Sequence, residues 1–155
     1  MKNMLLVLTL FILSGQLLAQ QLLEKTITHD GLERRYLVYV PEAYDGSEAW
    51  PVVLNFHELN GIPEGAIAIS RMNEIADTAH FLVVYPEAIV VPNFGVPGVT
   101  TDSLTLWNDG FLPDIGIDDV GFTNTLIDAL ATEYQVDLTR VYATGFGSGG
   151  GMVGR

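Results

Sequence analysis

The sequence has no cysteine among its 155 residues. The absence of cysteine excludes disulfide bonds, a thiolate nucleophile and zinc bound by thiolates. The chain has no disulfides to stabilise it, so we expect its hydrophobic core alone to hold the fold together.

Basic residues are also scarce in the sequence. Lys and Arg together number 7 against 19 Asp and Glu, and the formal net charge is −12 at pH 7. Such a charge repels the phosphates of nucleic acids and of anionic lipids. We therefore expect no nucleic-acid partner and no membrane partner once any signal is cleaved, and we expect substrates to be neutral or cationic.

The longest uncharged stretch lies at the amino end. Lys2 precedes an apolar core over Met4–Leu13, and the small residue Ala19 follows near a position typical of signal-peptide cleavage. The alternative is a membrane anchor, but polar residues interrupt the apolar run before the ~20 residues that a span requires. We therefore predict a signal peptide over residues 1–20 and one domain over residues 21–155, in a secreted or periplasmic protein.

Several segments of the remaining chain have the character of β-strands. Leu22–Thr28 and Arg34–Val40 flank Asp30-Gly31, a pair typical of the turn in a β-hairpin. Three short apolar runs follow, as expected of strands buried on both faces of a parallel sheet. These runs are Pro51–Phe56, Phe81–Tyr85 and Val141–Thr144.

Two segments have the apolar spacing of helices. One follows the capping residue Ser70 and has an apolar stripe within Met72–Ala79, and the other begins at Asp118, whose carboxylate caps it. The second helix should bury Phe122, Leu126, Leu130 and Tyr134. Proline and glycine are frequent in residues 87–117, which we expect to be loop. Strand and helix alternate, so we predict an α/β fold: a doubly wound sheet with helices on both faces and an amino-terminal β-hairpin.

A turn crowded with glycine follows the last predicted strand. Gly145, Gly147 and Gly149 are separated by Phe146 and Ser148. A strand that enters a helix through such a turn resembles the elbow G-x-S-x-G, in which α/β-hydrolases hold a nucleophilic serine above the sheet. Here the central position of the pattern is Gly147, and Ser148 stands one residue later.

The same glycines also match a dinucleotide-binding pattern. Gly145, Gly147 and Gly150 fit G-x-G-x-x-G after a strand. That pattern requires a helix, a second strand and a ribose-binding acid after it, and the residues up to Arg155 do not supply them. We therefore expect no nucleotide and no other cofactor.

The segment Arg140–Met152 resembles R-V-Y-A-T-G-F-S-N-G-G-M-M of secreted polyhydroxybutyrate depolymerases and feruloyl or acetylxylan esterases, a group of α/β-hydrolases. Other segments resemble this family in the same order. They are His57 with the loop after it, Ala76-Asp77, Phe81–Pro86, Trp107-Asn108 and Asp118–Phe122. The resemblance implies the amino-terminal half of an α/β-hydrolase sheet. It also implies a serine carboxylic-ester hydrolase whose substrate is a polyester or a plant cell-wall ester.

Two alignments of the turn with this family are open. Without a gap, Gly147 takes the place of the nucleophile, and no hydroxyl stands at the apex. With one glycine inserted, Ser148 becomes the catalytic candidate, but Phe146 then occupies a place where a small residue is normal. We prefer the ungapped alignment, because a tight turn tolerates a missing side chain better than an extra residue.

The resemblance also implies an oxyanion hole, the set of N–H donors that stabilises the charge formed in acyl transfer. His57 opens the matching loop over residues 57–61, Glu58 stands where the family has glycine, and Ser148 follows the apex of the turn. A carboxylate at Glu58 would oppose an oxyanion. We expect His57 to transfer no proton; the alternative is a core histidine bonded to nearby backbone.

By the same resemblance, Trp107 and Asn108 form part of the substrate pocket. Both residues lie in the segment that we expect to be loop. The alternative for Trp107 is an aromatic side chain that fixes this loop to the core.

Four other titratable side chains have weaker claims to a function. His29 lies in a hairpin turn and His80 at a helix end, and neither has a spacing that suggests a metal, so we expect none. Asp118 and Asp119 could form a paired-carboxylate site, but helix capping explains the first and solvation the second.

A serine nucleophile needs a base, and the base needs an acid that orients it. In α/β-hydrolases both partners follow the serine along the chain, and the sequence reaches Arg155 before either of them. We therefore expect a truncated or remnant esterase without activity, with one sheet edge open for self-association. The alternative function is a secreted binding protein that uses the long loop and the sheet edge without chemistry.

Overall fold

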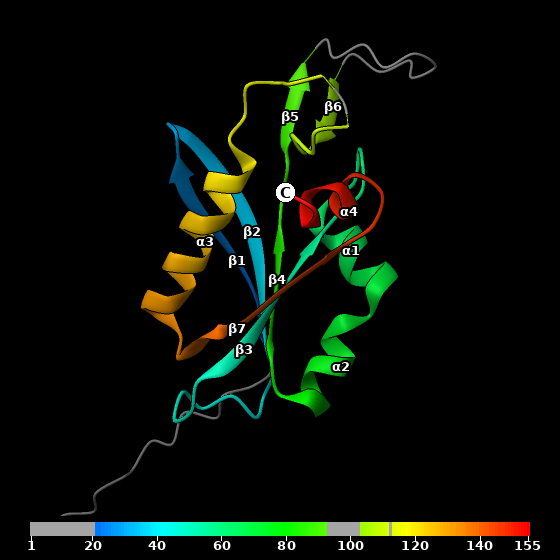
Figure 1. Ribbon diagram of the computed structural model, residues 1–155. Helices are drawn as coiled ribbons and strands as arrows, with labels where there is room; N and C mark the ends of the chain where they lie inside the picture. The colour runs from blue at the N-terminus through cyan, green and yellow to red at the C-terminus, as the bar shows by residue number, and fades with distance from the viewer. Residues whose placement is uncertain (1–20, 93–102, 112) are drawn as a thin grey trace, which may run out of the picture.

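The computed structural model describes residues 21–92, 103–111 and 113–155 of the chain (Figure 1). The predicted signal peptide, residues 1–20, lies outside these ranges, as does part of the long segment that was expected to be loop. Within the described residues, groups of strands alternate with groups of helices along the chain.

A five-stranded sheet in the order β1-β2-β4-β3-β7 forms the centre of the molecule. Strand β3 runs parallel to β4 and β7, whereas β2 pairs in antiparallel fashion with β1 and β4. The strands are β1 (Gln21–His29), β2 (Leu32–Val40), β3 (Trp50–Phe56), β4 (Leu82–Pro86) and β7 (Val136–Gly145). The predicted α/β sheet and its amino-terminal hairpin are confirmed, and the hairpin joins the parallel strands through β2.

Helices cover both faces of the sheet, as predicted (Figure 1). They are α1 (Pro63–Ser70), α2 (Met72–Ala79), α3 (Asp119–Glu133) and α4 (Ser148–Val153). Helices α1 and α2 share a core with Leu37 and Val83, whereas α3 shares the other core with Val38 and Val84. Since successive side chains of a strand point to opposite faces, the unbroken apolar runs of β2 and β4 supply both cores.

Three parts of the fold differ from the expectation. Strand β7 was expected to be buried on both faces, but none of its residues is buried, because it lies at the edge of the described sheet. Helix α1 was not predicted, because it has only a weak apolar stripe and no side-chain cap; its start is marked by Pro63 at the first position. Residues 87–117 were expected to be loop, but they contain β5 (Ile89–Pro92) and β6 (Ser103–Leu106). These two strands pair as an antiparallel ribbon that extends beyond the carboxyl end of β4 (Figure 1).

Helix α3 begins where the sequence predicts. The Oδ1 atom of Asp118 accepts a hydrogen bond from the backbone N–H of Gly121 at 2.8 Å, which makes Asp118 the N-cap. The predicted side chains that are buried are Phe122, Leu126 and Leu130. Tyr134 instead follows the last helical residue and is half-buried.

Asp119 is buried, so the prediction that solvent surrounds its carboxylate was wrong. Arg34 Nη2 donates a hydrogen bond to Asp119 Oδ1 at 2.7 Å, and the backbone N–H of Asn108 donates to Oδ2 at 2.7 Å. The guanidinium lies 3.9 Å from the centroid of the Phe122 ring. Burial lowers the pKa of Arg34, and the neighbouring Asp119 carboxylate opposes that shift. This ion pair joins β2 to the first turn of α3 inside the core.

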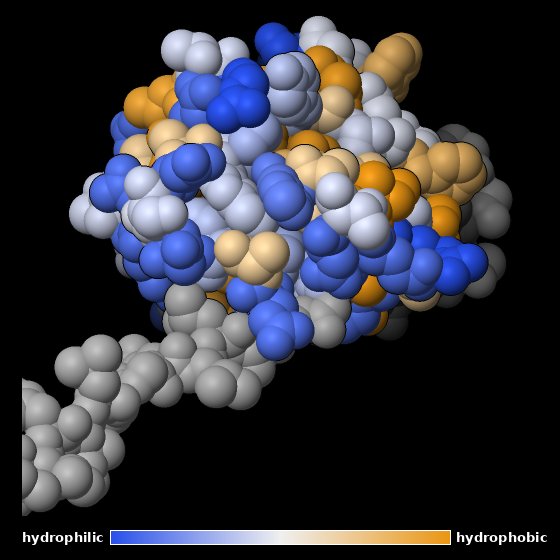
Figure 2. Space-filling view, turned by 90° about the horizontal axis from the view of Figure 1, so that it is seen from below, coloured by the Kyte–Doolittle hydropathy of each residue, from blue (hydrophilic) through white to orange (hydrophobic). Residues whose placement is uncertain are grey.

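Figure 2 shows the surface at the end of the molecule that lies lowest in Figure 1. Hydrophilic residues dominate this face, and hydrophobic residues gather toward one side of it. Of the helices in the described ranges, none has both the length and the apolar character to cross a bilayer.

Candidate active site

The glycine-rich turn joins the carboxyl end of β7 to α4. Strand β7 ends at Gly145 and α4 begins at Ser148, so only Phe146 and Gly147 lie between them. Gly147 has φ 56° and ψ −124°, a backbone conformation in the region that residues with a Cβ rarely adopt. The chain therefore makes a sharp strand-to-helix turn with Gly147 at its apex, which is the kind of turn that holds the nucleophile in α/β-hydrolases.

Two further glycines allow the turn to pack tightly. A Cβ at Gly145 would lie 2.4 Å from the backbone carbonyl of Gly149. A Cβ at Gly149 would lie 2.2 Å from the carbonyl oxygen of Phe56 and 2.6 Å from that of His57. These approaches are too close for any side chain, so the glycines let α4 rest directly on the ends of β7 and β3.

Ser148 is the first residue of α4, one position after the apex. Its hydroxyl oxygen is buried and has no hydrogen-bond partner within the described residues. The exposed apex residue, Gly147, has no side chain. The residue with the unusual backbone conformation is therefore Gly147, whereas the residue with a hydroxyl is Ser148. Because Ser148 is the first residue of α4, its backbone N–H has no carbonyl acceptor within the helix.

His57 is completely buried at the end of β3. Its Nδ1 donates to the carbonyl oxygen of Glu58 at 2.7 Å, and its Nε2 accepts from the backbone N–H of Ala88 at 3.0 Å. These two bonds fix the neutral tautomer with the proton on Nδ1, and burial lowers the pKa of the ring. The ring therefore has the contacts of a core histidine, and both of its nitrogens are engaged by backbone rather than by Ser148.

Glu58 faces the apex of the turn. A Cβ at Gly147 would lie 3.2 Å from Glu58 Cβ, and the Oε2 atom of Glu58 is buried without a hydrogen-bond partner among the described residues. The carbonyl oxygen of Glu58 accepts from the N–H of Gly61 at 2.9 Å, and Asn60 N donates to the carbonyl of Thr105 at 2.7 Å. The loop over residues 57–61 is therefore held in place with Glu58 Cβ beside the apex, and the carboxylate carbon of Glu58 lies 3.2 Å from where a Cβ at Gly61 would stand.

Trp107 lies in the hydrophobic core. Its ring is completely buried against Phe56, and Nε1 donates to the carbonyl oxygen of His57 at 2.9 Å. These contacts are those expected of an aromatic side chain that fixes the loop to the core. Asn108 cross-links the loop before α3: its Nδ2 donates to Asp114 Oδ1 and to the carbonyl oxygen of Ile117, both at 2.9 Å.

A small pocket lies beside the turn, with a volume of about 110 Å³. Its walls include His57, Glu58, Ala66 and Phe146, but not Trp107 or Asn108. A larger hollow of about 450 Å³ lies at the other end of the sheet, where the carboxyl ends of β2 and α3 meet. The chemistry expected of the turn belongs to the smaller of these two pockets, because Gly145 and Phe146 line it.

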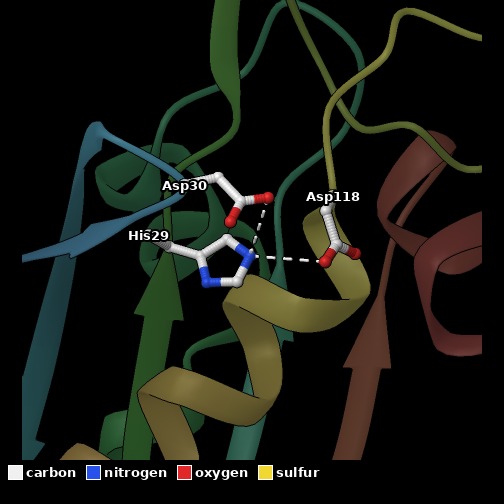
Figure 3. A group of neighbouring side chains, drawn as sticks. All are labelled: His29, Asp30 and Asp118. Carbon is white, nitrogen blue, oxygen red and sulfur yellow. Dashed lines mark hydrogen bonds and ion pairs between the residues drawn. The ribbon is translucent and has the colours of Figure 1, made fainter.

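The fold brings together one group of side chains that no spacing in the sequence indicates. His29 and Asp30 from the hairpin turn lie beside Asp118 at the start of α3 (Figure 3). The expectation of no metal site rested on spacing along the chain, which cannot show that these two distant segments meet. Only the packing of α3 against the hairpin places them side by side.

Comparisons with known proteins agree with this geometry, although no family model matches the chain. The chain is 31% identical over 119 residues to feruloyl esterase B of Piromyces equi, a match that covers 77% of this chain and 20% of that protein. It is 28% identical over 120 residues to the bifunctional acetylxylan esterase/xylanase XynS20E of Neocallimastix patriciarum, covering 77% of this chain and 15% of the relative. The chain thus spans a fifth or less of the length of these two relatives.

Solved structures give the same fold. A ferulic acid esterase superposes with a TM-score of 0.61 over 88% of this chain and 52% of its own, at 15% sequence identity. At that identity the likeness concerns the fold alone. The chain therefore has the α/β-hydrolase fold and is related in sequence to carboxylic-ester hydrolases of the feruloyl and acetylxylan esterase kinds.

Proposed function

We propose that this chain derives from an exported esterase of plant cell-wall esters and that its glycine-rich turn does not itself hydrolyse them. The observation that carries this proposal is the conformation of Gly147, which occupies the apex of a nucleophile-type turn without a side chain. Residues 1–20 would direct export and be cleaved from the exported chain, leaving a single domain from residue 21 onward.

The substrate class follows from the relatives and from the charge. Two of the relatives are a feruloyl esterase and an acetylxylan esterase, so feruloyl and acetyl esters are favoured over polyhydroxybutyrate. Both groups are neutral, which suits a chain with a net charge of −12. The pocket beside the turn, at about 110 Å³, is smaller than the ~300–1,000 Å³ of typical ligand sites, and it suits an acetyl group better than a feruloyl group.

The proposed lack of hydrolysis rests on three contacts. Ser148 Oγ is buried without a partner among the described residues, so no base is in place to take its proton. Both nitrogens of His57 are bonded to backbone, which leaves neither free to act as that base. Glu58 brings a carboxylate into the loop whose N–H groups would form the oxyanion hole, with its carbon 3.2 Å from where a Cβ at Gly61 would stand, and a negative charge there opposes an oxyanion.

Ester turnover by the purified chain tests the proposal. We expect no turnover of p-nitrophenyl acetate, p-nitrophenyl butyrate or methyl ferulate above the rate in buffer, by wild type and by Ser148→Ala alike. Turnover by wild type that is lost in Ser148→Ala would show that Ser148 is the nucleophile and would support the alignment with one inserted glycine.

The same features favour a second candidate function, binding of the ester without hydrolysis. The 110 Å³ pocket remains next to the turn although the apex has no hydroxyl. Calorimetric titration with methyl ferulate and with an acetylated xylo-oligosaccharide distinguishes an inactive esterase remnant from an ester-binding protein. Saturable heat without product would indicate a binding protein, and no heat with either ligand would contradict it.

A further inference from the structure

We propose that His29, Asp30 and Asp118 form a surface site for a divalent transition-metal cation such as Zn²⁺. The site lies where the β1–β2 hairpin turn meets the first turn of α3 (Figure 3). It is separate from the glycine-rich turn and does not depend on the proposed esterase ancestry.

The spacing of the three side chains suits a metal of this class. His29 Nε2 lies 3.4 Å from Asp118 Oδ2 and 3.8 Å from Asp30 Oδ2, and one ligand atom from each residue lies within 4.8 Å of the others. Zinc binds nitrogen and carboxylate oxygen at about 2.0–2.2 Å in tetrahedral geometry, so two of its ligands stand about 3.4 Å apart. Only a small movement of the exposed Asp30 side chain is needed to bring its carboxylate to the ligand spacing of a tetrahedral metal site.

The hydrogen bonds of Thr125 determine which nitrogen of His29 carries the proton. The hydroxyl of Thr125 has one proton, which it donates to the carbonyl oxygen of Gly121 at 3.0 Å. It must therefore accept from His29 Nδ1, which lies 3.0 Å away. In the neutral ring Nε2 then directs a lone pair toward two carboxylates. A metal ion at this point satisfies all three groups, and a second hydrogen bond that orients a ligating histidine is a usual feature of metal sites.

The local structure holds two of the three ligands in place. Asp118 uses Oδ1 to cap α3 and leaves Oδ2 facing the ring. Gly121 makes room for this arrangement, since a Cβ there would lie 2.0 Å from Asp118 Oδ2 and 2.9 Å from His29 Cε1. His29 is mostly buried, whereas Asp30 is exposed and can adjust.

The nature of the ligands determines the class of metal. Imidazole favours Zn²⁺, Cu²⁺ and Ni²⁺ over Ca²⁺ and Mg²⁺, which prefer six or more oxygen ligands. The net charge of −12 attracts any cation, although the positive end of α3 weakly opposes one at this position. Three protein ligands leave a fourth position for water.

Calorimetric titration of the untagged full chain with Zn²⁺ at pH 7.5 tests the site. We expect one saturable site in wild type and loss of at least tenfold in affinity in His29→Gln. Asp118→Asn should weaken binding to a similar extent, because asparagine can still cap the helix but supplies no charge. Thr125→Val, which removes the hydroxyl that orients the ring, should weaken binding about 10–100-fold.

The matched control is His80→Gln, which removes a histidine far from the cluster and should bind as wild type does. Far-UV circular dichroism of each variant without metal establishes that it is folded. Co²⁺ should show visible absorption bands of a four-coordinate site in wild type but not in His29→Gln. Absence of Zn²⁺ binding in wild type, or binding of equal strength in folded His29→Gln and Asp118→Asn, would overturn the proposal.

Discussion

Gly147 has a positive φ of 56°, and the space where its side chain would stand is limited by Glu58. The same two residues determine what the turn can do chemically, since one supplies no nucleophile and the other supplies a negative charge. Ser148 lies next to them with a buried hydroxyl. The backbone of a hydrolase elbow is therefore present, but the nucleophilic side chain that usually stands at its apex is not.

Substitution of Gly147 should therefore lower stability. Gly147→Ala and Gly147→Ser place a Cβ at a strained φ, and we expect each to reduce the free energy of unfolding by about 1–3 kcal/mol. The added contact of 3.2 Å with Glu58 acts in the same direction. Urea unfolding measures the change. Gly147→Ser should also show no ester hydrolysis, because neither nitrogen of His57 is free to serve as its base.

The control for this prediction is Gly65→Ala in α1. A Cβ at Gly65 would meet no atom within 4 Å, and alanine favours a helix over glycine by about 1 kcal/mol. We expect Gly65→Ala to raise the free energy of unfolding. If Gly147→Ala were as stable as wild type, the strain attributed to the apex would be absent.

His57 should give stability a dependence on pH. Burial lowers its pKa in the folded protein below the ordinary value of 6.5, so the unfolded chain binds the proton more readily. The stabilisation is complete above about pH 6.5 and is lost as the pH falls below that value. Urea unfolding between pH 7.5 and pH 5.5 should show a falling free energy of unfolding. His80→Gln should keep this dependence, and folded His57→Gln should lose most of it.

At the scale of elements, α3 has a central role in the assembly of the fold. Asp118 at its start contacts His29, the buried Asp119 contacts Arg34, and its apolar stripe packs into the core of the sheet. Asp119 joins β2 through Arg34 and the loop through the backbone of Asn108. Helix α3 thus connects the β1–β2 hairpin, the sheet and the loop that contains Asn108.

Breaking the buried ion pair should be costly. Asp119→Asn leaves the guanidinium of Arg34 buried without a charged partner, and we expect a loss of about 3–5 kcal/mol in the free energy of unfolding. Asp128→Asn is the matched control, since Asp128 lies on the exposed face of the same helix, where changes are within about 0.5 kcal/mol. Thermal and urea unfolding of both variants check this, and equal losses would contradict it.

Elements with a strong local signal could be predicted from the sequence. The Asp-Gly turn, the apolar runs of β3 and β4, and the cap of α3 are local features, and each appears where expected. Helix α1 lacks such a signal because no side chain caps it, and strands β5 and β6 are short and pair with each other across an intervening segment. The burial of Trp107 and Asp119, and the meeting of His29 with Asp118, likewise depend on long-range contacts.

At the scale of the whole molecule, β7 lies at an edge of the described sheet and pairs only with β3. Large hydrophobic side chains near this edge are exposed, among them Leu138, Tyr142 and Phe146. An edge strand with unpaired backbone groups and apolar neighbours is a template for pairing with another chain. We therefore expect this edge to favour self-association.

Self-association should weaken when a charge is placed on the edge. Light scattering after size exclusion should show a mass that rises with concentration for wild type, and a smaller rise for Tyr142→Lys. Ile75→Lys is the control, because Ile75 is similarly exposed but lies on α2. A monomeric wild type across the whole concentration range, with a sharp two-state unfolding transition, would contradict this expectation.

The proposal that the turn carries no competent nucleophile is tested most directly by a fluorophosphonate probe, which reacts with activated serine hydroxyls. Intact-mass spectrometry of the folded chain after incubation should show no adduct in wild type, because Gly147 has no side chain and Ser148 Oγ is buried without a base. A stoichiometric adduct that maps to Ser148 and disappears in Ser148→Ala would contradict the account and show that the turn retains a working nucleophile.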